Sequence, residues 1–223
     1  MRRVIEFLTK VALTALVWGT CWWAGSVSLS DRLNLLIIAG GVSLVVPLVW
    51  LGRNILDRRP TATRAIWTTT FVHVGLGFLL GIPIVRAVVS HRTWYGATLP
   101  IPLGIGRVLV AITGSACLLA VVNLAWKGLG APFFIALSRR LAADWLYSRT
   151  RNPMVLAALA FFLSLGIWFQ SLLFVLWVLL LLTPAWLVFL RVYEERELEI
   201  RFGAPYLEYK SRTPMLFPKR HNR

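Results

Sequence analysis

The feature of this chain that most constrains its fold is one long apolar stretch. Residues 153–190 contain no charged side chain. A helix rises about 1.5 Å per residue and needs about 20 apolar residues to cross a hydrocarbon core, so this stretch is long enough to cross a bilayer twice. Polar clusters flank it at both ends, and a helical hairpin would return its end to the face where it began. We therefore expect the two clusters to meet on one side of a membrane.

Composition places the whole chain in the same class. Of its 223 residues, 58% are hydrophobic and 15% are charged, whereas about 25% charged residues is usual in soluble domains. The net charge of +15 would suggest nucleic-acid binding in a soluble protein. Here the basic residues flank apolar runs, so we expect contact with membrane lipids and no nucleic-acid partner. Cys21 and Cys117 lie in apolar stretches without metal-ligand spacing, so no metal site is predicted.

Six apolar runs have lengths suited to transmembrane helices. They are residues 8–28, 33–51, 66–85, 104–126, 153–168 and 171–191. The first run lacks a convincing cleavage site, so we expect a retained helix and not a signal peptide. The last two come from the single apolar stretch, which we divide at Gly166 and the polar pair Gln170-Ser171. The sequence predicts an all-α, polytopic membrane protein with about six transmembrane helices and a cytoplasmic C-terminal helical segment.

The distribution of basic residues tests this count independently, because Lys and Arg accumulate on the cytoplasmic side. With the N-terminus inside, 20 of the 24 Lys and Arg residues fall in inner segments. We therefore expect both termini in the cytoplasm and the protein in a bacterial inner membrane. At the outer end of the third run, we expect Arg86 to snorkel to the interface. His73 is either satisfied by the threonines at 68–70 or serves as a relay or ligand within the membrane.

The polar cluster after residue 190 contains acidic residues that topology does not explain. It holds Glu194, Glu195, Glu197 and Glu199. On a helix, Glu194 and Glu197 share one face while Glu195 and Glu199 share another, so only one of the adjacent pair can point into a given pocket. The other can pair with an arginine. The cluster is a candidate functional site, with the solvated face of a surface helix as the alternative.

The polar cluster before the apolar stretch has an interfacial composition. Residues 127–152 are too polar to cross a membrane but carry aliphatic and aromatic side chains suited to its surface. Donors and acceptors concentrate before Asn152-Pro153, where proline suits the first turn of a helix. An ordinary inner loop with stop-transfer charges is the alternative. Beyond the last run, Gly203 is expected to end a helix, and Tyr206 and Tyr209 lie one turn apart.

An ordered set of these residues carries a resemblance to a known family. The set comprises Gly130-Ala-Pro132, Arg139-Arg-Leu141, Tyr147, Arg151-Asn-Pro-Met154, Glu194-Glu195 with Leu198, Phe202-Gly203 with Tyr206 and Tyr209, and Pro214 with Pro218. It resembles the isoprenylcysteine carboxyl methyltransferase and phospholipid methyltransferase superfamily, which are integral-membrane enzymes that use S-adenosylmethionine. The resemblance covers residues 127–218. We expect N-terminal transmembrane helices at 1–126, forming a scaffold or the substrate side, and a methyltransferase-like region at 127–223.

The resemblance implies an S-adenosylmethionine site at the cytoplasmic face. Its catalytic residues would be Glu194 and Glu195. Its cofactor-binding residues would be Tyr147, Arg151, Asn152, Pro153, Met154, Glu195, Phe202, Gly203, Tyr206 and Tyr209. The chain departs from the family pattern in two places. Val155 and Ala157 stand where Tyr and Gly usually follow Pro-Met, and Arg196 stands where Pro often follows the glutamate pair.

The implied function is transfer of a methyl group to a lipophilic or membrane-partitioned acceptor. An isoprenylcysteine-type carboxylate, a phospholipid amine and a small thiol are all open. A carboxylate or thiolate needs no base, whereas an ammonium group must first lose a proton, for which Glu194 or Glu195 is the candidate. The alternatives are a non-catalytic membrane protein that binds lipid or assists assembly, and a sterol-reductase-like enzyme that uses NADPH.

Overall fold

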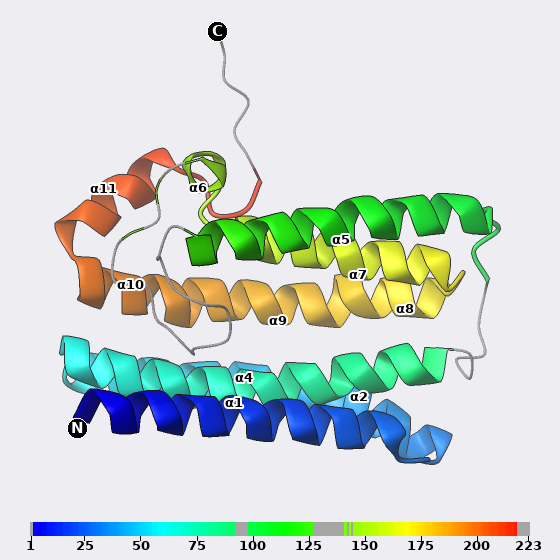
Figure 1. Ribbon diagram of the computed structural model, residues 1–223, viewed down its shortest axis with the longest axis horizontal. Coiled ribbons are helices and arrows are strands. Elements are labelled where there is room, and N and C mark those ends of the chain that lie inside the picture. Colours follow the sequence, from blue (N-terminus) through cyan, green and yellow to red (C-terminus); the bar gives the residue numbers. More distant parts are fainter. Residues whose placement is uncertain (1, 92–97, 127–140, 142, 144, 218–223) are drawn as a thin grey trace, which may run out of the picture.

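The computed structural model describes residues 2–91, 98–126, 141, 143 and 145–217, and in this part of the chain the fold is all-helical (Figure 1). The helices are α1 (Arg2–Ser26), α2 (Asp31–Ser43), α3 (Val45–Arg58), α4 (Ala62–Ser90), α5 (Leu103–Trp126), α6 (Leu146–Arg149), α7 (Pro153–Trp168), α8 (Leu172–Trp177), η2 (Val178–Leu182), α9 (Thr183–Val188), η3 (Phe189–Glu194), α10 (Glu195–Phe202) and α11 (Ala204–Arg212). The all-α prediction is confirmed. Most of the predicted interfacial segment at 127–152, together with Pro218, lies outside the described residues.

Four helical segments are long and apolar enough to cross a membrane. They are Asp31–Arg58, Ala62–Ser90, Leu103–Asn123 and Leu172–Phe202. Each contains one of the predicted spans or nearly all of it. The other two predicted spans are also helical, but α7 has only 16 residues, and α1, which carries Lys10 and three tryptophans, is not among the four. The polytopic membrane fold is thus confirmed, with four segments that meet the length and hydropathy of a span.

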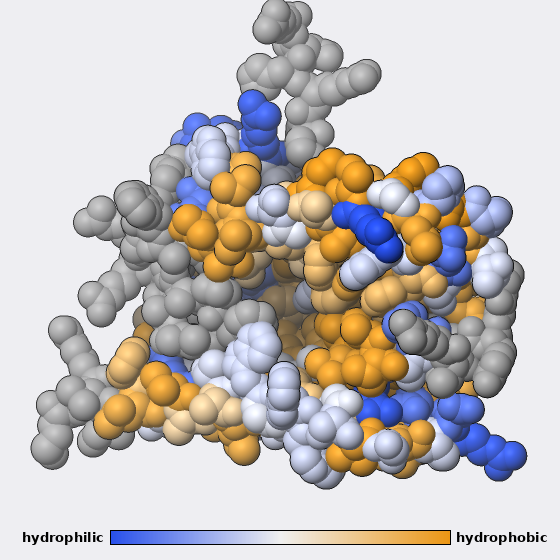
Figure 2. All heavy atoms as spheres, turned by 45° about the vertical axis from the view of Figure 1, so that its right-hand side comes forward, coloured by the Kyte–Doolittle hydropathy of each residue, from blue (hydrophilic) through white to orange (hydrophobic). Residues whose placement is uncertain are grey.

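The outer surface suits a lipid environment. Large apolar side chains are exposed along α1, α2 and α5, and Trp22 is 83% exposed. Figure 2 shows hydrophobic side chains across much of the face on view. In a membrane these side chains face hydrocarbon, so their exposure in the isolated chain carries no hydrophobic cost there.

The helices pack in layers around one core. Helix α4 packs against α1, α2 and α3. The η3 turn packs against α3, and α10 packs against α4. Helix α5 runs beside α7 along its length (Figure 1). Buried residues from three of these segments, Val45, Val72 and Leu190 among them, meet in the core. The N-terminal helices therefore lie directly against the segment that carries the glutamate pair.

The apolar stretch forms the predicted hairpin. Helix α7 ends at Trp168 and α8 begins at Leu172, with Gln170 at a φ of 54° in the turn. The Ser171 hydroxyl accepts a hydrogen bond from Phe174 N and caps α8. Gly166 permits the close approach of the two arms, because an added Cβ would lie 2.7 Å from Val175 Cγ2. The break is therefore where Gly166 and Gln170-Ser171 indicated.

The second arm of the hairpin is one continuous helical segment with two π-helical turns, η2 and η3. A π-helical turn contains more residues than an α-helical turn, so it changes the face on which the following residues lie. The η3 turn ends at Glu194, and α10 begins at Glu195. The orientation of the glutamate pair is therefore set at this irregular turn, a feature often found at functional sites.

The structure describes the surroundings of two α4 residues that the sequence analysis singled out, Arg86 and His73. Arg86 was expected to snorkel, and this is wrong, because its side chain is only 4% exposed. Its Nη1 donates to the carbonyl oxygens of Ala24 and Val27, and its Nε donates to Asn34 Oδ1. These acceptors satisfy the cation inside the bundle. His73 Nδ1 lies 2.9 Å from the carbonyl oxygen of Thr69, as expected of a histidine satisfied by hydrogen bonding.

Candidate functional site

The two polar clusters meet at the end of the molecule where α6, α10 and α11 lie (Figure 1). Glu195 joins them, because its Oε1 lies 2.7 Å from Arg151 Nη1 and its Oε2 lies 2.6 Å from Lys210 Nζ. The Arg151 and Glu195 side chains are only 11% and 14% exposed. An ion pair so far removed from water requires both partners, since loss of one leaves a buried charge.

Three tyrosines surround this ion pair. Arg151 Nη1 donates to the hydroxyl of Tyr206 at 3.3 Å. The Tyr209 hydroxyl donates to the carbonyl oxygen of Tyr147 at 2.6 Å, and the ring centroids of Tyr206 and Tyr209 are 6.3 Å apart. Burial is the main cause that raises the pKa of Tyr206 well above its ordinary value, and the negative charge of Glu195 is the second cause. Tyr206 therefore stays protonated near neutral pH and presents a neutral ring and hydroxyl.

Glu194 has a different environment from its neighbour. Its side chain is half-buried, and no hydrogen bond or ion pair joins it to any other residue in the described ranges. Glu194 lies near Tyr147. Burial of that tyrosine is the larger cause, and the negative charge of Glu194 the smaller one, that together raise the pKa of Tyr147 to about 12. The sequence predicted that one glutamate of the pair would bind an arginine. Glu195 does so, and the Glu194 carboxylate is left available to a ligand.

The C-terminal segment at residues 213–217 covers the turn that precedes α7. The carbonyl oxygen of Pro214 accepts from Arg151 N at 2.9 Å. The carbonyl oxygen of Met215 accepts from Asn152 Nδ2 at 2.9 Å and from Thr150 Oγ1 at 3.2 Å. Asn152 therefore ties the C-terminal segment to the start of α7, and Pro153 occupies the first turn of that helix, as expected.

The remaining predicted site residues lie at the edge of this group. Met154 is half-buried in the first turn of α7. The Phe202 ring lies 4.9 Å from the Arg201 guanidinium carbon. Gly203 ends α10 with a φ of 58°, a conformation that favours glycine, and begins the turn into α11. These residues build the elements around the ion pair, whereas Val155, one of the departures from the family pattern, packs against the hydrophobic core.

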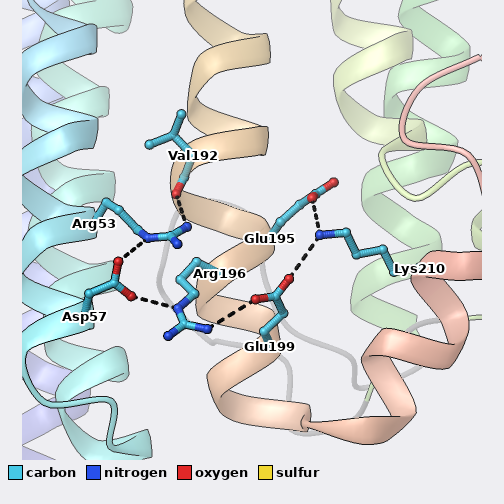
Figure 3. Close-up of polar contacts among 7 residues, drawn as sticks. All are labelled: Arg53, Asp57, Val192, Glu195, Arg196, Glu199 and Lys210. Carbon is cyan, nitrogen blue, oxygen red and sulfur yellow. Dashed lines mark hydrogen bonds and ion pairs between the residues drawn. The ribbon is translucent and has the colours of Figure 1, made fainter.

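A row of alternating charges continues from the site to the N-terminal helices (Figure 3). Lys210 Nζ also lies 3.0 Å from Glu199 Oε1, and Glu199 Oε2 lies 3.4 Å from Arg196 Nη1. Arg196 Nε lies 2.8 Å from Asp57 Oδ1 on α3. Glu195 and Arg196 extend to opposite sides of α10 (Figure 3). Arg196, which replaces a proline common in the family, therefore anchors α10 to α3.

A second set of contacts holds η3 against α3 and α4. Arg53 Nη1 donates to the carbonyl oxygen of Val192 at 3.0 Å. Tyr193 is fully buried, and its hydroxyl lies 2.9 Å from Thr69 Oγ1. Gly52 provides the space for its ring, because an added Cβ would lie 2.9 Å from Tyr193 Cε2. The residues on both sides of the glutamate pair are thus fixed to the N-terminal helices.

The residues of this region that the sequence did not predict include Lys210, Asp57 and Thr69. Asp57 had a signal, since it is the one acidic residue in the basic segment 53–64. Neither Lys210 nor Thr69 had one, because a lysine near a basic C-terminus and a threonine in a helix are ordinary residues.

The fold and the site define an all-α polytopic membrane protein with a largely buried ion-paired cluster at one end of its helices. Residues 103–204 match the family model for phospholipid methyltransferase. This confirms the resemblance, and places that part of the chain in the isoprenylcysteine/phospholipid methyltransferase superfamily. The match includes α5, α7, Arg151 and both glutamates, and indicates a methyltransferase acting on lipid-like substrates. Comparison with curated proteins and with solved structures gave no match.

Proposed function

We propose that this protein transfers a methyl group from S-adenosylmethionine to a lipophilic acceptor, at the site formed by α6, α7, α10 and α11. The observation that carries the proposal is the Glu194 carboxylate, which has no ion-pair partner among the described residues and lies next to the Arg151–Glu195 ion pair in the region that matches the methyltransferase family. A half-buried carboxylate without a direct ion pair or hydrogen bond among the described residues is costly for the protein alone, and this cost supports a role in binding a ligand.

The residues present fit the groups of this cofactor. S-adenosylmethionine has cationic sulfonium and ammonium groups, a carboxylate and an adenine ring. Glu194 can pair with a cation. Arg151 Nε, buried without a hydrogen-bond partner among the described residues, can donate to a carboxylate. The faces of Tyr147 and Tyr206 can contact a cation or an aromatic ring. Bound there, the cofactor supplies an electrophilic methyl group and a neutral leaving group.

Alignment is then the main task of the protein, because little charge needs to be stabilised in the transfer. The ion pairs of Glu195 fix α10 against the turn that precedes α7 and against α11, and the C-terminal segment covers the turn at Thr150–Asn152. A lipophilic acceptor would enter from the bilayer between helices. If that acceptor is an ammonium, Glu194 is the carboxylate free to accept its proton. An isoprenylcysteine-type carboxylate or a small thiolate would need no such step.

Binding to the detergent-purified protein tests the proposal. We expect saturable binding of S-adenosylmethionine by calorimetry, weakened in Glu195→Gln, and no saturable binding of NADPH. Transfer of a labelled methyl group to extracted membrane lipids then identifies the class of acceptor. Absence of saturable S-adenosylmethionine binding would overturn the proposal. NADPH binding would favour a sterol-reductase-like enzyme, and binding of lipid alone would favour a non-catalytic protein.

A further inference from the structure

Two buried hydrogen-bond donors lack a partner in the described part of the chain. They are Asn123 Nδ2, near the end of α5, and Arg151 Nε, just before α7. Asn123 is only 6% exposed, so water does not readily satisfy its amide. Buried polar groups are nearly always hydrogen-bonded in native proteins, and an exception requires an explanation such as a ligand.

The register of α5 against α7 shows where Asn123 lies. Near the far end of the pair, a Cβ added to Gly106 would lie 2.5 Å from Trp168 Cα. Further along, a Cβ added to Gly114 would lie 3.4 Å from Phe161 Cε2. The two helices are therefore antiparallel and closely packed. Continuing this register along α5 places Asn123 at the same height along the helix pair as the start of α7.

Arg151, at that same level, has one edge of its guanidinium group in use. Its Nη1 binds Glu195 and Tyr206. The other edge of the Arg151 guanidinium group is formed by Nε and Nη2. The same edge of a different arginine, Arg86, donates two hydrogen bonds to Asn34 Oδ1. No contact with the residues described here uses that edge of Arg151. A guanidinium edge donates two parallel hydrogen bonds and matches the geometry of carboxylate and phosphate oxygens.

We propose that Asn123 and the free edge of Arg151 form a subsite for an anionic oxygen group of a bound ligand. This inference rests on the proposed function, under which the site takes two ligands that can supply such a group. One source is the carboxylate of the S-adenosyl cofactor, and the other is the phosphodiester of a lipid headgroup. The two unpartnered atoms of the subsite, Asn123 Nδ2 and Arg151 Nε, are donors, whereas Glu194 offers an acceptor for a cation. The two ends of the site thus accept opposite charges.

The test is Asn123→Leu, which keeps the approximate volume and removes the amide. Ser164→Ala on α7 is the matched control, since the Ser164 hydroxyl is buried but already donates to the carbonyl oxygen of Ala160. Because Asn123 Nδ2 has no hydrogen-bond partner among the described residues, the unliganded Asn123→Leu protein should unfold at the wild-type temperature or above. A ligand that uses the amide should bind about tenfold or more weakly, because a hydrogen bond to a charged group is lost.

Two probes distinguish the sources of the anionic group. If the cofactor carboxylate binds there, Asn123→Leu raises the Kd of S-adenosylhomocysteine and leaves that of methylthioadenosine, which lacks the amino-acid part, unchanged. If the lipid phosphate binds there, S-adenosylhomocysteine binds as before, and the half-saturating fraction of phosphatidylethanolamine in dodecylmaltoside micelles rises. The Ser164→Ala protein should match the wild type with both probes.

Unchanged binding of both probes by Asn123→Leu would overturn the inference while leaving the proposed function in place. Failure of the wild-type protein to bind either probe would overturn both. If Asn123→Leu folds poorly, Asn123→Asp serves instead, because it keeps the shape and adds a negative charge that repels an anion. Wild-type affinity for both probes in Asn123→Asp would also overturn the inference.

Discussion

Glu194 and Glu195 are adjacent in sequence and have opposite electrostatic environments. Glu195 lies between Arg151 and Lys210 and is neutralised by both. Glu194 has no ion-pair partner in the part of the chain that the structure describes. The Glu195 carboxylate therefore contributes to the packing of the fold, whereas the proposed function assigns the Glu194 carboxylate to a ligand. Mutations at these two positions should separate stability from activity.

We expect Glu195→Gln to lower the free energy of unfolding by about 1–3 kcal/mol, because Arg151 would stay largely buried without its counter-charge. Glu194→Gln breaks no ion pair or hydrogen bond recorded among the described residues, so its free energy of unfolding should not fall. Both changes should reduce methyl transfer by about tenfold or more. Thermal unfolding and transfer of a labelled methyl group measure the two effects. Equal destabilisation by both substitutions would contradict this distinction.

The sequence could predict that one glutamate of the pair binds an arginine, but it could not predict which. The helical spacing separates their directions by about 100°, and that alone does not say which direction faces α7. The choice is made by η3 and by the contacts of Tyr193 and Arg196 with the N-terminal helices. Lys210 could not be predicted either, because its role depends on how α11 folds back after Gly203.

At the scale of elements, η3 is a segment through which the N-terminal helices contact the chain that carries the glutamate pair. Tyr193, the residue directly before Glu194, packs into the space over Gly52 and contacts Thr69. Sequence patterns predicted that the last span would continue as a helix into the acidic cluster, and it does. They did not predict a π-helical turn, because the turn depends on packing between segments more than 120 residues apart.

Gly52→Ala should disturb this contact. The added methyl group would lie 2.5 Å from Val72 Cγ2 and 2.9 Å from Tyr193 Cε2, both on buried side chains. Overpacking of this kind costs about 1–3 kcal/mol, and displacement of Tyr193 should also reduce methyl transfer. Gly40→Ala on α2 is the matched control, since its Cβ would meet nothing within 4 Å. Equal melting temperatures and activities of the two variants would show that the contact does not position the site.

At the scale of the whole molecule, the class of fold followed from a few strong signals. The charge-free stretch at 153–190 and the low charged fraction indicated membrane helices, and the turn residues divided the stretch correctly. The packing of α3 and α4 against α10 could not be predicted. Lipid-facing helices are apolar all round, so their sequences do not indicate which face contacts a neighbouring helix. Asp57 joins these halves, although it lies outside both the predicted motifs and the family match.

The orientation of the molecule across the membrane is the last prediction. The predicted topology has five membrane crossings between residue 28 and residue 211. With that number, 20 of the 24 basic residues lie in segments on the cytoplasmic side. In a background with Cys21→Ala and Cys117→Ala, we expect a membrane-impermeant maleimide to label Ser28→Cys in spheroplasts, because that position is exposed and the predicted topology puts the end of α1 outside. Ser211→Cys, exposed near the end of α11, should be labelled only after lysis. Labelling of both variants before lysis would require an even number of crossings between them and would contradict the predicted topology.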